Sequence, residues 1–455
     1  MALVCLLTMA GCSSVATQKG FYSPITAELQ AGNFDAAVNG LEAARAAKKF
    51  KDKDRFLYFL DAGLANHYAR RFDSSIARLS LAESAADELF TRSISRAALS
   101  LLLNDNALEY AGEDYEVLYT NLFKALGFIV VDSIEPALVE LRRADDKLKL
   151  LEQKYADAAA TLNSKAQADS SAPRINYEAK KVRFHNDAFA RYLSMHLYAA
   201  AGKMDDARID HELLQRAFAD QPHIYPFEPP PVRYLSDGKP IISIVAMAGL
   251  SPVKEALELR IRTDKRLNLV QILYTDPQRQ GTEFANLPLP ISEDYYFDLS
   301  LPQIVSRPSL IRNIRVVIDS VPRGELGLIE DVCAIAQESF EAKRSLILLR
   351  SVARSLAKGL TTHKLKEKAD KGGAGGWLKS LAIDVASDIS EGADLRCSRL
   401  LPGRIYVGDF DIEPGRHNIT VEFLDSSGQV IRTQNISDYQ VVPNGLNLVE
   451  AVSLN

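Results

Sequence analysis

The chain has 455 residues, a length that suggests two or three domains. Charged residues make up 25% of it and the formal net charge is -5, which is the balance of an ordinary soluble protein. This charge argues against a nucleic-acid partner, because proteins that bind nucleic acids carry a strongly basic surface.

The chain begins with an apolar segment, residues 1–11, which has the shape of a secretory signal peptide and is too short to span a bilayer. Cys12 follows two small residues and precedes two serines, a pattern that resembles the lipobox of bacterial lipoproteins, where the thiol receives a diacylglyceryl group. Several acyl chains on one residue anchor a protein far better than a single chain. We therefore predict a signal peptide (1–11), lipidation at Cys12 and a tether (12–21); the alternative is an unmodified signal peptide. No later apolar run is long enough for a second membrane crossing.

A pattern of apolar and small residues recurs along the first half of the chain. Its first copy is Phe34-x-x-Ala37-x-x-x-Leu41-x-x-Ala44, and further copies begin at Phe72, Ile134 and Met204. These positions share one stripe of a helix, and the small residues let a second helix approach closely. The pattern resembles the second helix of the tetratricopeptide repeat. We predict an all-α, tetratricopeptide-like domain over residues 22–224; the alternative is a generic helical bundle.

The most distinctive stretch of this half, residues 110–148, combines an acidic helix start with a later basic pair. The candidate partner-binding residues here are Glu113, Asp114, Glu116, Glu140, Arg142 and Arg143. One interpretation is a charged groove that receives a partner segment. The other interpretation is structural. Acidic residues at a helix start stabilise the helix by interacting with the positive end of its dipole, and Glu140 is close enough in sequence to pair with Arg143 or Arg142.

The second half is predicted to be rich in strands, which makes the expected class α+β. A proline-rich linker (225–240) precedes a β-rich domain (241–330), in which Leu257, Leu259 and Ile261 alternate with charged residues. We expect residues 331–390 to form a basic amphipathic helical segment with a glycine-rich hinge. Residues 391–455 resemble a small β-sandwich module of bacterial surface proteins, and the strands on either side of the turn at Glu413-Pro414-Gly415 are expected to lie in one small antiparallel sheet.

Two features of the second half leave alternatives open. The basic helix suits an anionic membrane surface or an acidic partner, although such a helix usually packs on its own domain. Without the leader cysteines, Cys333 and Cys397 remain, and they form a disulfide in an oxidising compartment only if the fold brings them together. Two separate thiols are the alternative.

Three blocks together are similar to a little-characterised family of bacterial outer-membrane lipoproteins with a tetratricopeptide-like N-terminal half. They are the segment around Cys12, residues 110–148 and residues 393–405. The resemblance implies a protein attached to the outer membrane by its lipid, with a body in the periplasm. Family members are typically encoded near other envelope lipoproteins, which implies an envelope role and gives no mechanism.

The sequence shows no zinc motif of the His-Glu-x-x-His type, no Gly-x-Ser-x-Gly elbow and no dinucleotide-binding glycine signature, and we expect no cofactor. We predict a non-enzymatic adaptor whose helical repeats bind envelope proteins or peptide segments. One rival is an envelope enzyme of the cell-wall hydrolase type that draws its acid from Glu113, Asp114 or Glu140. The other is a structural subunit of a secretion or surface-organelle assembly.

Overall fold

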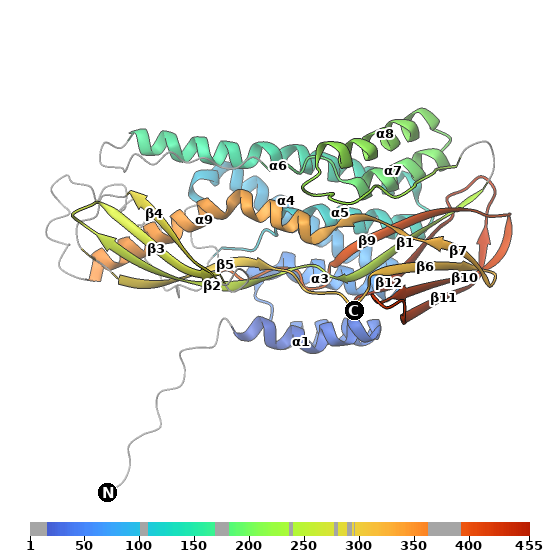
Figure 1. The fold of residues 1–455 in the computed structure, drawn as a ribbon, viewed down its shortest axis with the longest axis horizontal. Coiled ribbons are helices and arrows are strands. Elements are labelled where there is room, and N and C mark those ends of the chain that lie inside the picture. Colours follow the sequence, from blue (N-terminus) through green and yellow to red (C-terminus); the bar gives the residue numbers. More distant parts are fainter. Residues whose placement is uncertain are drawn as a thin grey trace, which may run out of the picture.

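The chain has a mixed α+β fold in which helices dominate the first half and strands the second (Figure 1). The expected α+β class is therefore confirmed. The fold is taken from a computed structural model that describes residues 16–100, 108–168, 182–235, 240–276, 281–288, 294, 296–362 and 393–455. Cys12 and the predicted signal peptide lie outside these residues.

The helices of the first half pair as consecutive antiparallel hairpins, and each helix also contacts the next along the chain. Each copy of the sequence pattern begins at the first residue of the second helix of a hairpin. The hairpins are α1 (Ala16–Ala31) with α2 (Phe34–Ala46), α3 (Arg55–Tyr68) with α4 (Phe72–Ser100), α5 (Asp114–Val130) with α6 (Ile134–Ala168), and α7 (Ala188–Ala200) with α8 (Met204–Asp220). A short 3-10 helix, η1 (Asp52–Asp54), precedes α3.

These hairpins share one turn geometry. The residue two positions before each second helix has a positive φ: it is 78° at Gly32, 58° at Arg70, 55° at Asp132 and 73° at Gly202. Its N–H donates to the carbonyl three residues back, and the next N–H donates to the carbonyl five residues back, at 2.8 to 3.0 Å in every case. This is the Schellman arrangement, which satisfies carbonyls left free at a helix end.

In the described part of the chain, the strands form three four-stranded sheets with the orders β12-β1-β9-β8, β11-β10-β6-β7 and β4-β3-β2-β5. Their bounds are β1 (Ile241–Leu250), β2 (Val253–Asp264), β3 (Leu269–Asp276), β4 (Gly281–Pro288), β5 (Tyr296–Val305), β6 (Asn313–Ile318), β7 (Val321–Glu325), β8 (Gly327–Asp331), β9 (Pro402–Asp411), β10 (Gly415–Leu424), β11 (Val430–Val441) and β12 (Leu448–Ser453). The predicted alternation of β2 is confirmed, because Leu257, Leu259 and Ile261 are buried.

The sheet β12-β1-β9-β8 lies between the helices and the sheet β11-β10-β6-β7. Val245 and Met247 of β1 belong to one buried core with the helices, whereas Ile244 and Ala246 belong to a second core between the two sheets. Successive side chains of a strand point to opposite faces, so both faces of β1 are covered. Strand β1 is accordingly buried along its whole length.

The pairing of the strands corrects one feature of the sequence analysis. Strands β9 and β10 were expected to be neighbours in one small sheet, but β9 pairs with β1 and β8, whereas β10 pairs with β6 and β11. The turn at residues 412–414 therefore carries the chain from one sheet to the other. As a result, the segments 241–330 and 391–455 contribute strands to the same two sheets.

Helix α9 (Val332–Thr362) lies between β8 and β9 in the sequence and contacts α5, β5 and β9. Leu346 on its apolar face is buried. The rest of the predicted basic segment, residues 363–392 with the glycine-rich hinge, lies outside the described residues. Among the helices that the structure describes, none combines the length and the apolar character that crossing a bilayer requires.

Candidate functional site

The acidic residues at the start of α5 form a helix cap. Glu113 is the N-cap, and it exchanges hydrogen bonds with Glu116 in a capping box. This arrangement satisfies N–H groups that would otherwise be free in the first turn. Glu113 and Glu116 are both buried, with 4% and 0% of their surfaces exposed, so their local role is that of a cap inside the protein.

Glu116 is held by three donors, two from the segment just before α5 and one from the segment before β9. It accepts hydrogen bonds from the N–H of Ser398 at 2.6 Å, the hydroxyl of Tyr110 at 2.7 Å and the N–H of Glu113 at 2.9 Å. Burial and the nearby charge of Glu113 raise the pKa of Glu116 to about 7, while the two backbone N–H groups act in the opposite direction. Glu116 therefore titrates near neutral pH.

The other two acidic residues of this helix start are paired with lysines. Glu113 forms ion pairs with Lys254 of β2 and Lys343 of α9. Burial raises the pKa of Glu113, but the two ammonium groups bring it down to about 2, so this carboxylate stays ionised. Asp114 pairs with Lys154 of α6 at 2.8 Å. The start of α5 thus ties together two neighbouring helices and a strand.

A segment just before β9 inserts into the helical half. The Ser398 hydroxyl donates to Asp61 of α3 at 2.5 Å, and its N–H donates to Glu116. Arg396 forms ion pairs with Asp54 at 3.0 Å and with Asp394 at 2.8 Å. Burial raises the pKa of Asp61 to about 6 in spite of its hydrogen bonds. The two internal blocks that carry the family resemblance, residues 110–148 and 393–405, therefore contact each other.

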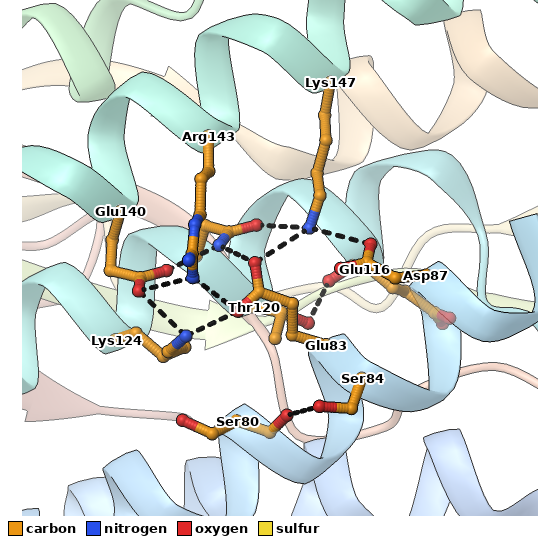
Figure 2. Close-up of polar contacts among 11 residues, drawn as sticks. Ser80, Glu83, Ser84, Asp87, Glu116, Thr120, Lys124, Glu140, Arg143 and Lys147 are labelled. Carbon is orange, nitrogen blue, oxygen red and sulfur yellow. Dashed lines mark hydrogen bonds and ion pairs between the residues drawn. The ribbon is translucent and has the colours of Figure 1, made fainter. Parts of the chain in front are cut away.

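Glu140 belongs to a separate buried charge cluster between α4, α5 and α6, in which cations from α5 and α6 converge on Glu83 and Glu140 (Figure 2). Lys124 lies 2.5 Å from Glu83 and 2.9 Å from Glu140. Asn121 donates to both carboxylates, at 2.7 and 2.6 Å, and accepts from Lys147 at 2.7 Å. Burial raises the pKa of Glu83, but these partners bring it down to about 2. The cluster is a satisfied network of ionised groups.

The two predicted arginines lie on the solvent side of α6. Arg143 has a half-exposed side chain and contacts Glu83 at 3.2 Å and Glu140 at 3.1 Å. Arg142 is exposed, and a hydrogen bond with Tyr198 raises the pKa of its guanidinium. Among the contacts of the described residues, none joins the side chains of Glu113, Asp114 and Glu116 to those of the Glu140 cluster. The six predicted residues therefore occupy separate sites.

The structure shows Cys333 and Cys397 as free thiols, which corrects the possible disulfide. Cys333 lies at the start of α9, whereas Cys397 is in the inserted segment and accepts a hydrogen bond from the N–H of Lys254 at 3.4 Å. Burial raises the pKa of Cys333 to about 12 and that of Cys397 to about 11, so neither thiol is a reactive thiolate.

A serine, a histidine and an aspartate meet where α7 contacts the inner sheet. Ser243 donates its hydroxyl hydrogen bond to Asp409 at 2.7 Å, and His196 lies 3.3 Å from the same carboxylate. Tyr192 also donates to Asp409, at 2.8 Å. A nucleophilic serine needs its hydroxyl bonded to a histidine base and open to substrate. Here the Ser243 hydroxyl donates to the carboxylate, and its oxygen also lies 3.4 Å from both ring nitrogens of His196. Only 1% of Ser243 is exposed, so the hydroxyl is closed to substrate and the arrangement is structural.

An open groove of about 870 Å³ lies between the turns of two helical hairpins and the edge of the β-sandwich. One wall comes from the α1–α2 and α3–α4 turns and the other from strands β11 and β12. The residues that line it are Gly32, Asn33, Phe34, Asp35, Ala36, His67, Tyr68, Ala69, Arg70, Phe72, Arg432, Thr433, Gln434, Asn435, Ile436, Glu450 and Val452. A second cavity, of about 150 Å³, lies between α4, α5 and α6.

Sequence reasoning missed the groove, and it also missed Glu83 and Lys124 of the charge cluster. Both sites depend on contacts between elements far apart in the chain, which local periodicity does not encode. Nowhere among the described residues do three or more histidine, cysteine, aspartate or glutamate side chains come together as metal ligands. In the comparisons with known proteins, no family model, curated protein or solved structure matches the chain.

Proposed function

We propose that this chain is a lipid-anchored adaptor of the bacterial cell envelope, which binds protein partners through its helical hairpins. The observation that carries the proposal is the groove of about 870 Å³, whose helical wall is made by two hairpin turns. Successive hairpins with one turn geometry stack as tetratricopeptide-like repeats do, and stacked repeats are a common scaffold for binding peptides and proteins. The likeness of these hairpins to tetratricopeptide repeats is part of the proposal.

The anchor in this proposal is Cys12. A diacylglyceryl group on its thiol would hold the protein at the outer membrane, with residues 12–21 as the tether and the body in the periplasm. The support is the sequence pattern alone, in which small residues precede the cysteine and an apolar leader precedes them. Lipid attachment at one end leaves the hairpin turns free to meet an envelope protein.

A non-enzymatic role is part of the proposal. A general acid with a raised pKa is useful to a hydrolase only if substrate can reach it. In the described part of the chain, raised pKa values occur at Glu116, Asp61, Asp187, Asp210 and Glu330, yet all of these carboxyls are buried and line neither of the two cavities described above. Their hydrogen-bond partners are other parts of the same chain. This favours a structural role for them.

The test is site-specific photo-crosslinking in living Gram-negative cells that express the full chain. A photoreactive residue replaces Asp35 or Arg71, which are exposed beside the groove, or Arg323 on the far edge strand β7 as the matched control. We expect one envelope protein to be captured from the two groove positions and not from β7. Capture of the same proteins from all three positions, or of none, would contradict the adaptor role.

The anchor is tested separately, by mass spectrometry of the mature N-terminus and by fractionation of a Cys12→Ser variant. We expect an acylated cysteine in the wild type and release of the variant from the membrane fraction. An unmodified N-terminus would contradict the anchor without touching the adaptor role.

A further inference from the structure

The groove runs along the edge of strand β11. Five consecutive residues of this strand, 432–436, line it. Side chains of a strand alternate between the two faces of the sheet, so consecutive residues can all border one groove only where it follows the edge. Strand β11 is the last strand in the order β11-β10-β6-β7. The groove thus offers the backbone of an edge strand, which is a template for pairing with another strand.

The direction of the backbone groups follows from the neighbouring strands. The N–H of Arg312 donates to the carbonyl of Leu424 at 2.8 Å, so Leu424 of β10 directs its backbone groups to the side of β6. Backbone groups alternate in direction along a strand. Phe423 and Val421 therefore direct their backbone N–H and carbonyl groups to β11.

The partners of these residues on β11 are Arg432 and Gln434. Their N–H and carbonyl groups are used inside the sheet, so those of Thr433 and Asn435 point outward, along the groove. Both residues are exposed. Two outward N–H groups and two outward carbonyls, spaced by one residue, match the ladder that an extended peptide forms with an edge strand.

The neighbouring strand β12 is less open to pairing. The side-chain amide of Gln434 donates to the carbonyl of Glu450 at 3.0 Å and accepts from the N–H of Val452 at 2.9 Å. A peptide in the groove would therefore pair with β11 and use β12 and the hairpin turns as its other wall.

A buried histidine–glutamate pair that lines the groove has polar atoms without hydrogen-bond partners. His67 of α3 and Glu450 of β12 lie 2.7 Å apart, with side chains only 1% and 5% exposed. Nδ1 of His67 and Oε1 of Glu450 are buried and have no hydrogen-bond partner among the described residues. A peptide carries both N–H donors and carbonyl acceptors, so it suits a carboxylate oxygen beside an imidazole nitrogen.

The charged side chains that line the groove determine which peptides bind best. Its acidic residues are already paired, because Asp35 contacts Arg71 at 2.7 Å and Glu450 contacts His67. Guanidinium groups border both walls. Arg70 lies on the helical side over Phe72, and Arg432 lies on the strand, where its guanidinium stacks over Phe34 and donates one hydrogen bond to the carbonyl of Ala31 at 3.2 Å, which leaves its other N–H groups for a ligand. An acidic ligand is favoured, since guanidinium groups bind carboxylates well.

We propose that the groove binds an acidic, extended peptide segment of a partner protein, which adds to the sheet as a strand beside β11. This inference rests on the proposed adaptor function and gives it a binding mode, β-strand addition. The outward backbone of Thr433 and Asn435 provides affinity, and Arg70 and Arg432 provide the preference for acidic side chains.

The test is fluorescence anisotropy on the purified chain, with a labelled, end-blocked peptide of alternating valine and glutamate as the probe. Thr433→Pro removes one outward N–H without touching a bond inside the sheet, and we expect it to weaken binding by about tenfold. Thr433→Ala, which keeps the N–H, should bind like the wild type. Arg70→Glu should weaken binding, whereas Arg323→Glu on the opposite edge strand should not.

Hydrogen exchange keeps the inference testable if a variant fails to fold. In the wild type, the probe should slow exchange at the amides of Thr433 and Asn435. Unchanged exchange at both amides, equal binding by Thr433→Pro and Thr433→Ala, or tighter binding of a peptide with lysine in place of glutamate would each overturn it. If Thr433→Pro still captures the crosslinked partner, the binding mode fails while the adaptor function stands. If no position captures a partner, the adaptor function itself fails.

Discussion

Lys124 shows how the helical half holds charge in its interior. Its side chain is 4% exposed, and its ammonium group bridges Glu83 and Glu140, which come from two other helices. A buried ion is costly unless partners and hydrogen bonds replace its water. Asn121 and Lys147 complete that replacement, so the network is stable as a unit and sensitive to the loss of one member.

Replacing Lys124 with methionine should therefore destabilise the protein strongly. Lys124→Met keeps the volume but leaves two buried carboxylates short of a cation, which we expect to lower the free energy of unfolding by about 3 kcal/mol. The matched control is Arg143→Met, because Arg143 contacts the same carboxylates with a half-exposed side chain, and it should cost less than about 1 kcal/mol. Urea unfolding of both variants measures the difference, and equal losses would contradict this account.

Glu116 should make stability depend on pH near neutrality. Its pKa is about 7 in the folded protein against an ordinary value of 4.5, so the folded state holds a proton that the unfolded state releases between these values. The free energy of unfolding should therefore fall as pH rises from about 4.5 to about 7. Asp61, with a pKa of about 6, acts in the same direction.

The variant Glu116→Gln has no proton to release, so its stability should change less over the same pH range. Urea unfolding at several pH values gives the two slopes. Part of the slope should remain in the variant, because Asp61, Asp187 and Asp210, whose pKa values are each raised to about 6, are unchanged. Parallel slopes for the two proteins would show that Glu116 does not titrate in this range.

At the scale of elements, the sequence predicts where the second helix of each hairpin begins, but it does not predict that the hairpin turns share one geometry. The starts of α2, α4, α6 and α8 could be predicted, because an apolar stripe is a local pattern. Two of the turns carry glycine at the left-handed position, which is a residue that marks a turn in a sequence. The other two carry Arg70 and Asp132, so only the structure shows that all of these turns are alike.

A substitution at Gly202 measures how much stability the positive φ of a hairpin turn costs a residue that has a side chain. Its φ is 73°, and nothing lies within 4 Å of the place where a Cβ would stand, so Gly202→Ala adds strain without a clash. We expect a loss of about 1 kcal/mol of stability. Gly20 inside α1 also has open space, and Gly20→Ala should have the opposite sign, a gain of up to about 1 kcal/mol. Thermal unfolding distinguishes the two, and a neutral Gly202→Ala would contradict the shared turn.

The strands were harder to predict than the helices. Alternation identified β2, because one of its faces is buried and the other is solvated. It did not identify β12, which is buried on both faces and pairs in parallel with β1, about two hundred residues earlier in the chain. Nor did it separate β9 from β10, because the turn between them reads like that of a hairpin. Pairing between distant strands is a tertiary property and leaves little local signal.

At the scale of the molecule, the helices and the sandwich share one core. A continuous cluster of buried apolar side chains joins Leu64 of α3 to Val245 of β1 and Val452 of β12. Polar contacts cross the same boundary, since Ser398 binds Asp61 and Glu116, and Tyr68 donates to the carbonyl of Leu400 at 2.8 Å. The groove lies along this boundary, so its shape depends on both halves remaining joined.

A substitution in the core of the helical half should therefore lower the hydrogen-exchange protection of strands that are distant from it in the sequence. Leu64 is fully buried, and Leu64→Ala should cost between about 2 and 5 kcal/mol through the cavity it leaves. If the two halves unfold together, amides of β1 and β12 should lose as much exchange protection as those of α3. Hydrogen exchange with mass spectrometry reads all three elements in one experiment. Faster exchange confined to the helices would mean that the sandwich is stable by itself and that the groove joins two independent units.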